Sequence, residues 1–268
     1  METLLWRDIA QFYHADLRNL AGPYDRSYGM DMRRYASVIG IWMRLATDKI
    51  HALFPDTDRP FEHEHDIAFV PLIAFLGARV PPDARERLLA FQGERQIEHV
   101  ISDSPRRVAT AWLGKDRMLG GEFTSRTAPQ STQLHPATIH WRIDAEQIGW
   151  VRLFYLEPVD ARASRDRLEI VTTSEIAFLV HAPGAPIEQI ARENWQLPGL
   201  SVRVETNAEA MDVRPLCHSE RSEESRNREN EMLHCVQHDT LDGCDYFEIR
   251  YIVASDQPIA CALNCESG

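Results

Sequence analysis

The chain has 268 residues, of which 44% are hydrophobic, and a formal net charge of -12. This length and composition indicate a globular protein with one large domain or two ordinary ones. The acidic balance argues against nucleic acid or an anionic membrane as the main partner, although a local cluster of arginines can bind an acidic sugar whatever the total charge.

The sequence predicts a cytoplasmic chain as written, without metal or cofactor. No run approaches the roughly 18 to 20 apolar residues of a membrane-spanning helix, and the N-terminus lacks the basic and apolar regions of a signal peptide. All five cysteines lie from Cys217 onward at irregular spacing, which is neither a disulfide framework nor the paired CxxC pattern of a structural zinc site. A glycine-rich phosphate loop is also missing.

The N-terminal part has the pattern of helix pairs. Apolar residues recur with the helical period over residues 3–20, and Gly22-Pro23 ends this first predicted helix. Further helices are expected over 31–54, 66–78 and from Pro81 to Gly93.

The pattern changes near Ser102. Seven short runs rich in Val, Ile, Thr and aromatic residues follow, separated by Gly, Pro and Asp, as is typical of antiparallel strands. We therefore predict the α+β class, with a helical domain over residues 1–104 and an antiparallel β-sandwich over 105–268.

Residues 217–240 differ in composition from both parts and lack apolar periodicity. The run HSERSEES at 218–225 resembles the peptide that a dispersed bacterial repeat element produces when it is translated. We expect a disordered insertion at 215–241. The alternative interpretation is a charged regulatory or metal-binding loop.

The densest chemistry lies in residues 10–32, which hold His14, Asn19, Tyr24, Arg26 and Tyr28 around the Gly-Pro turn. Such side chains can remove a proton beside a carboxylate and neutralise the charge that develops. The structural alternatives are that the tyrosines anchor a turn and that His14 is a hydrogen-bonded residue on a helix face.

The segment PYDRSYG at 23–29 resembles the P-Y-x-x-S-Y-G motif of the hyaluronate, chondroitin and xanthan lyases. The resemblance implies an incomplete α/α toroid followed by an antiparallel β-sandwich. It also implies that Tyr28 abstracts and returns the proton and that arginines bind the sugar acid. His14 lies farther from the tyrosine than the family's histidine, and Asn19 lies where that histidine is expected. His14 as helper and Asn19 with Arg26 on the carboxylate are therefore local hypotheses.

The helices that would complete a toroid are missing before residue 3, so we expect an N-terminally truncated relative whose parent was secreted or periplasmic. Substrate contacts are predicted for Tyr24, for His63 and His65 in FEHEHD, and for His135 and Trp141 in QLHPATIHW. His140 and Trp141 should point to opposite faces of one strand. A solvated loop for the first pair of histidines and core packing for Trp141 are the structural alternatives.

The predicted function is cleavage of a uronate-containing glycan by β-elimination, with an acidic polysaccharide or oligosaccharide as partner. One alternative is a glycoside hydrolase on an α/α scaffold, with Asp25, Asp31, Glu62 and Glu64 as candidate carboxylates. The other is an inactive fragment or a non-catalytic carbohydrate-binding protein. No oligomeric state is predicted.

Overall fold

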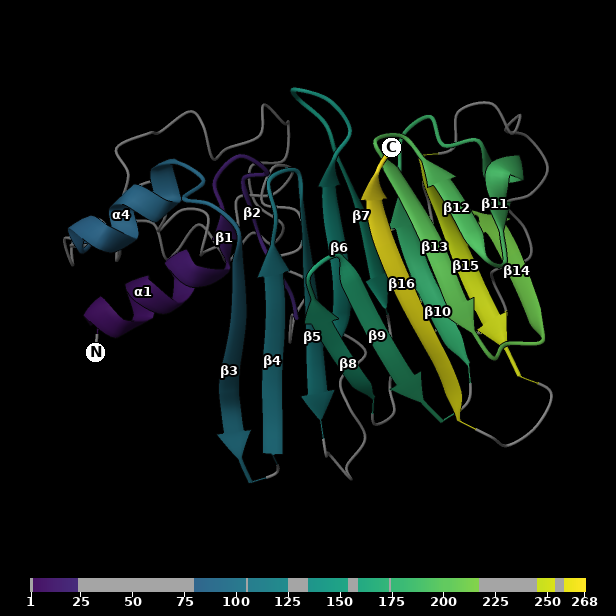
Figure 1. Ribbon diagram of the computed structural model, residues 1–268, viewed down its shortest axis with the longest axis horizontal. Coiled ribbons are helices and arrows are strands. Elements are labelled where there is room, and N and C mark those ends of the chain that lie inside the picture. Colours follow the sequence, from purple (N-terminus) through teal and green to yellow (C-terminus); the bar gives the residue numbers. More distant parts are fainter. Residues whose placement is uncertain are drawn as a thin grey trace, which may run out of the picture.

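The computed structural model describes residues 2–23, 80–104, 106–124, 135–153, 159–173, 175–216, 245–253 and 258–268. This part of the chain is predominantly β and holds two short α-helices, α1 (Glu2–Phe12) and α4 (Pro82–Leu89) (Figure 1). The two helices pack together through Trp6 and Ala10 on one and Leu88 on the other. Neither is long and apolar enough to cross a membrane.

The predicted α+β class with an α/α toroid is wrong. The sheet begins at Arg95, inside the part that was expected to be helical. The helix expected over 3–20 stops at Phe12, because the chain turns back as a hairpin of β1 (Tyr13–His14) and β2 (Asn19–Leu20). The apolar periodicity continues through this hairpin because its side chains are also buried, so periodicity alone could not locate the end of the helix.

Arg95 explains why α1 ends where it does. Its guanidinium donates hydrogen bonds to the carbonyl oxygens of Gln11 at 2.9 Å and Tyr13 at 2.6 Å, with a longer contact to Ala10 at 3.4 Å. The last carbonyls of a helix have no partner within it, and a cation there also complements the helix dipole. A residue distant in sequence therefore supplies the cap.

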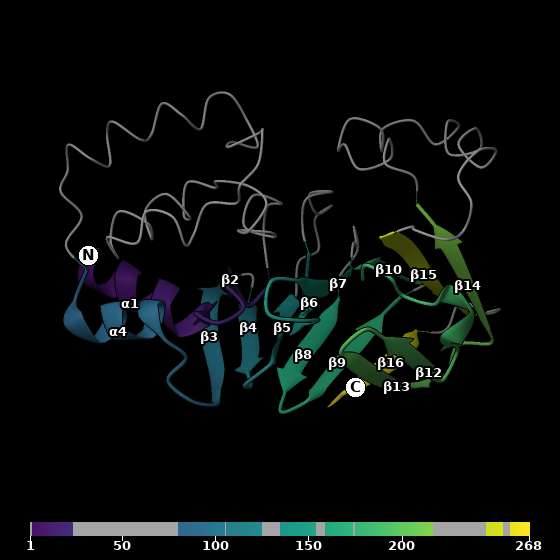
Figure 2. The ribbon, with the colours of Figure 1, turned by 90° about the horizontal axis from the view of Figure 1, so that it is seen from above.

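Within the described ranges, fourteen strands form one antiparallel sheet that curls until it nearly closes into a barrel (Figures 1 and 2). We call its two parts the first and second half-sheet; they are joined where Phe123 pairs with Asp160. The first half-sheet contains, in spatial order, β3 (Arg95–Asp103), β4 (Arg106–Leu113), β5 (Arg117–Thr124), β6 (Ala137–Arg142), β7 (Ile148–Leu153), β10 (Ile176–His181), β15 (Tyr246–Ile252) and β14 (Ala210–Pro215). The second contains β8 (Asp160–Ser164), β9 (Arg167–Thr172), β16 (Ile259–Ser267), β13 (Leu200–Thr206), β12 (Asn194–Leu197) and β11 (Ile190–Ala191), the last preceded by the 3-10 turn η3 (Ile187–Gln189).

The main core fills the space between the half-sheets. Residues of strands in both half-sheets point into it, such as Val151 on β7, Phe178 on β10, Leu168 on β9 and Val202 on β13. Each half-sheet therefore has an outer face, formed by the intervening residues, which points away from this core. The two outer faces carry most of the polar side chains discussed below.

The predicted insertion at 215–241 lies largely outside the described residues. The strands on either side of it pair directly, with Pro215 opposite Phe247 and the Leu216 N–H donating to Tyr246 O at 2.9 Å. The partner of β15 on this side is β14, whereas β13 pairs with β16.

Candidate functional site

The structure places some of the predicted site residues and not others. Tyr24, Arg26, Tyr28, His63 and His65 lie outside the described residues. Their proposed roles therefore stay predictions from the sequence.

His14 and Asn19 lie opposite each other in the β1–β2 hairpin, and both are fully buried. The His14 Nε2 lies 2.7 Å from Gly114 O, and its Nδ1 accepts the Leu17 N–H at 3.2 Å. Both ring nitrogens are thus engaged by the main chain, and burial lowers the pKa of the imidazole. These contacts give His14 a structural role as a neutral link between the hairpin and the sheet.

The two β-region candidates are also buried. Trp141 belongs to the main core, and its indole N–H donates to Pro198 O at 2.7 Å. A Cβ at Gly149 would lie 2.1 Å from the Trp141 ring, so this glycine makes room for the indole. His140, the next residue along β6, points to the outer face, while His135 is buried at the entry to the strand. Trp141 therefore presents its ring to the core rather than to a sugar.

A cavity of about 380 Å³ opens at one end of the second half-sheet. We call it the arginine cavity, because four guanidinium groups contribute to its wall. The lining residues are Arg117, Arg165, Asp166, Arg167, Arg203, Asn264, Cys265, Glu266 and Ser267.

A tight turn between β8 and β9 positions part of this cavity. Ser164 pairs with Arg167, so that Arg165 and Asp166 form a two-residue hairpin loop. Asp166 adopts a φ of 57°, a left-handed conformation that Asp tolerates better than most residues. Its carbonyl accepts the Cys265 N–H at 2.8 Å, which ties the loop to β16.

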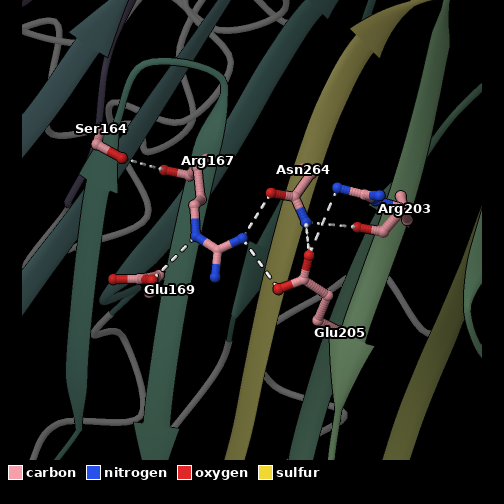
Figure 3. A network of polar contacts seen from close by, with 6 residues as sticks. All are labelled: Ser164, Arg167, Glu169, Arg203, Glu205 and Asn264. Atoms are coloured by element: carbon pink, nitrogen blue, oxygen red, sulfur yellow. Dashed lines mark hydrogen bonds and ion pairs between the residues drawn. The ribbon is translucent and has the colours of Figure 1, made fainter.

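Arg117 and Arg167 are held in place by neighbouring side chains. Arg117 donates to Asp166 through Nε at 2.6 Å and to Ser267 at 2.8 Å. Arg167 donates to Glu169 at 2.9 Å, and its Nη1 reaches both Asn264 at 2.6 Å and Glu205 at 3.1 Å (Figure 3). These two guanidinium groups are therefore oriented before any ligand arrives.

Arg165 and Arg203 are far more exposed, with 73% and 69% of their side chains accessible to solvent. Each makes one long ion pair within the described residues. Arg165 pairs with Glu94 at 3.3 Å. Arg203 pairs with Glu205 at 3.5 Å, as Figure 3 shows. Exposed ion pairs of this kind contribute little free energy. Both arginines thus keep donors that an incoming anion can use.

Two titratable groups, Cys265 in the cavity wall and Glu205 beside it, are poorly suited to proton transfer. A hydrogen bond from Arg167 and its positive charge lower the pKa of Glu205, so this carboxylate is ionised at neutral pH and is a poor acid. Burial raises the pKa of Cys265 to about 12, which keeps the thiol protonated and unreactive. The arrangement can therefore hold an anionic ligand by charge-assisted hydrogen bonds.

Sequence reasoning missed this site, although a signal was present. Arg167 and Glu169, and likewise Arg203 and Glu205, alternate with apolar residues in runs that were predicted as strands. The alternation identifies them as outward-facing residues of two strands. It does not reveal that β16 lies between those strands and brings the four side chains together.

Comparison with protein families gave two matches. A model described as Domain of unknown function (DUF8769) matches residues 1–78, and one described as Domain of unknown function (DUF8770) matches residues 93–256. No curated protein and no solved structure matched the chain.

The resemblance to the hyaluronate, chondroitin and xanthan lyases is wrong. The matching models belong to no lyase family, and the described residues form a curled sheet rather than a toroid. The expectation of a lyase active in polysaccharide degradation is therefore wrong as well. The motif covered only seven residues around a Gly-Pro turn, a setting in which tyrosines are common for structural reasons. The second match covers more than half of the sequence, and the chain belongs to the family of the Domain of unknown function (DUF8770).

Proposed function

We propose that the protein is a non-catalytic carbohydrate-binding protein that recognises an acidic oligosaccharide at the arginine cavity. The observation that carries the proposal is the convergence of Arg117, Arg165, Arg167 and Arg203 on one open cavity in a chain of net charge -12. Two carboxylates, Asp166 and Glu266, share the lining, so the cationic groups outnumber the anionic ones there.

The chemistry of the lining favours a carboxylate on a polyhydroxylated molecule. Guanidinium groups match the two oxygens of a carboxylate with parallel hydrogen bonds. Asn264 and Ser267 add neutral polar groups of the kind that bind sugar hydroxyls. Binding without cleavage is the simpler hypothesis, since neither Glu205 nor Cys265 is tuned for acid-base or nucleophilic chemistry.

The test is calorimetric titration with a panel of oligosaccharides. The panel contains a uronate oligosaccharide, a neutral one of the same length, a sulfated one and inorganic phosphate. We expect the uronate to bind and the neutral analogue to bind at least tenfold more weakly, a difference of about 1.4 kcal/mol or more. Equal binding of the acidic and neutral sugars would contradict the proposal, and tighter binding of phosphate or sulfate would change the ligand class.

Variants of the exposed cavity arginines test whether the uronate binds at the arginine cavity. Replacing both exposed arginines, Arg165→Gln and Arg203→Gln, should weaken uronate binding by about tenfold or more, since hydrogen bonds to charged groups contribute about 1.5 to 3 kcal/mol. The matched control is Arg214→Gln, which removes an arginine whose side chain is 58% exposed from β14 on the other half-sheet. The control should bind as the unmodified protein does.

A further inference from the structure

One carboxylate in the wall of the arginine cavity differs from the others near it. Glu266 lies near the end of β16, and strand alternation turns its side chain to the outer face, away from the buried Cys265. On the neighbouring strand β13 it faces Ser201. Glu266 is exposed to solvent. A ligand in the cavity therefore meets this carboxylate as well as the guanidinium groups.

The other carboxylates at the cavity already have cationic partners. Four of them pair with arginines of the cavity wall: Asp166 with Arg117, Glu94 with Arg165, Glu169 with Arg167, and Glu205 with both Arg167 and Arg203. Among the residues that the structure describes, none forms an ion pair or a side-chain hydrogen bond with Glu266. Its negative charge therefore remains available to a ligand.

The side chains around Glu266 bind other groups. On β13, Arg203 is the diagonal neighbour of Glu266, at about 7 to 8 Å by the geometry of antiparallel strands. Its guanidinium pairs with Glu205 instead (Figure 3). The Ser201 hydroxyl donates to the Gln196 Oε1 at 2.7 Å. Glu266 and the exposed Arg203 thus remain separate charges of opposite sign in one cavity.

A simple anion matches only part of this charge pattern. A carboxylate is attracted by Arg165 and Arg203 but repelled by Glu266, because like charges in one site oppose each other. An ammonium group on the same ligand offsets the repulsion, since it carries a positive charge and can donate up to three hydrogen bonds to carboxylate oxygens. The net charge of -12 also favours the approach of a cationic group. The cavity therefore fits a ligand that carries both charges.

We infer that the ligand of the arginine cavity is zwitterionic, namely a uronate linked to an amino sugar whose amine is unsubstituted. The uronate carboxylate binds Arg165 and Arg203, and the ammonium group of the neighbouring sugar binds Glu266. This inference rests on the proposed function and narrows its ligand from an acidic oligosaccharide to one that also carries positive charge. Glu266 is then the residue that determines this specificity.

The experiment compares two disaccharides that differ only in the charge of one nitrogen. D-glucuronate linked to D-glucosamine and its N-acetylated form are titrated into the full chain by calorimetry, at a mildly acidic pH at which the amine is protonated and the uronate is ionised. We expect the amine form to bind about threefold to fivefold more tightly, as for one partly exposed ion pair.

Variants of the carboxylate test whether Glu266 is the source of this preference. Glu266→Gln keeps the size of the side chain and removes its charge, so the two disaccharides should bind equally. Glu266→Asp keeps the charge and should retain the preference for the amine. The matched control is Glu209→Gln, which removes an exposed carboxylate outside the cavity wall and should leave the preference unchanged. Because Glu266 is exposed, both of its variants should fold as the unmodified protein does.

The possible outcomes separate this inference from the proposed function. Equal affinity of the unmodified protein for the two disaccharides, or a preference that persists in Glu266→Gln, would overturn the zwitterionic ligand. The proposed function would still stand if both disaccharides bind and Arg165→Gln with Arg203→Gln weakens them. Absence of binding by either disaccharide would overturn both.

Discussion

Two arginine–carboxylate pairs, one on each outer face of the sheet, lie in opposite environments. On the first half-sheet, the Arg107 guanidinium and Glu122 carboxylate form an ion pair whose side chains are 9% and 1% exposed. On the second, Arg167 and Glu169 form a pair of comparable geometry with 33% and 54% exposure. All four residues belong to paired strands of the one sheet. The difference shows that burial, rather than the presence of an ion pair, decides what such a pair contributes to folding.

The largest effect is expected from breaking the buried pair. Glu122→Gln removes the negative charge from the buried ion pair with Arg107 and should lower the free energy of unfolding by about 3 to 5 kcal/mol. The matched change Glu169→Gln on the exposed face should cost only about 0 to 1 kcal/mol. Urea unfolding of both variants measures the contrast. Similar losses of unfolding free energy in the two variants would mean that burial does not change what the ion pair contributes to stability.

The next effect concerns how closely the N-terminal segment approaches the first face. A Cβ at Gly120 would lie 2.1 Å from the carbonyl oxygen of Gly22, so Gly120→Ala forces the two backbones apart. We expect a loss of about 1 to 3 kcal/mol in unfolding free energy, as for overpacked sites. Ala260→Val, which adds atoms on the exposed second face, should stay within about 0.5 kcal/mol. A Gly120→Ala protein as stable as the Ala260→Val protein would refute the close approach.

A smaller effect should appear in the pH dependence of stability. Burial lowers the pKa of His14 in the folded protein below its ordinary value of about 6.5, so the unfolded chain binds a proton more readily. The stability that this neutral imidazole contributes is fully present above that value and is lost as the pH falls below it. His14→Gln should therefore flatten the fall in urea midpoint between about pH 7.5 and 5. The same substitution at the exposed His99 is the control, and identical slopes for the unmodified protein and His14→Gln would contradict the assignment.

The smallest effect, and one of opposite sign, is expected at the arginine cavity. Glu205 binds Arg167 and Arg203 and competes with an external anion for their donors. Glu205→Gln should therefore tighten uronate binding by a few-fold, on the order of 0.5 to 1 kcal/mol. Calorimetry with Glu209→Gln, an exposed carboxylate that follows β13, provides the comparison. Weaker binding in Glu205→Gln would show that this carboxylate contacts the ligand instead.

Much of the β region could be read from the sequence, but its pairing could not. TIHWRID covers β6 except Ala137, IGWVRLF contains β7, and the opposite directions of His140 and Trp141 follow from strand alternation. β3 was mistaken for part of a helical block because its exposed side chains give it little alternation to detect. The arginine cavity needed β16 placed between β9 and β13, an order that no local pattern encodes.

The composition of the sequence determined the negative net charge. The sequence also determined the strand-forming runs and the alternation that assigns residues to the two faces of each strand, since these depend on neighbours along the chain. The tertiary structure decided where α1 stops, which polar strand residues are buried and which arginines meet. The physical reason is that a helix cap from Arg95, the exposure of a sheet face and the convergence of charges all depend on residues far apart in sequence.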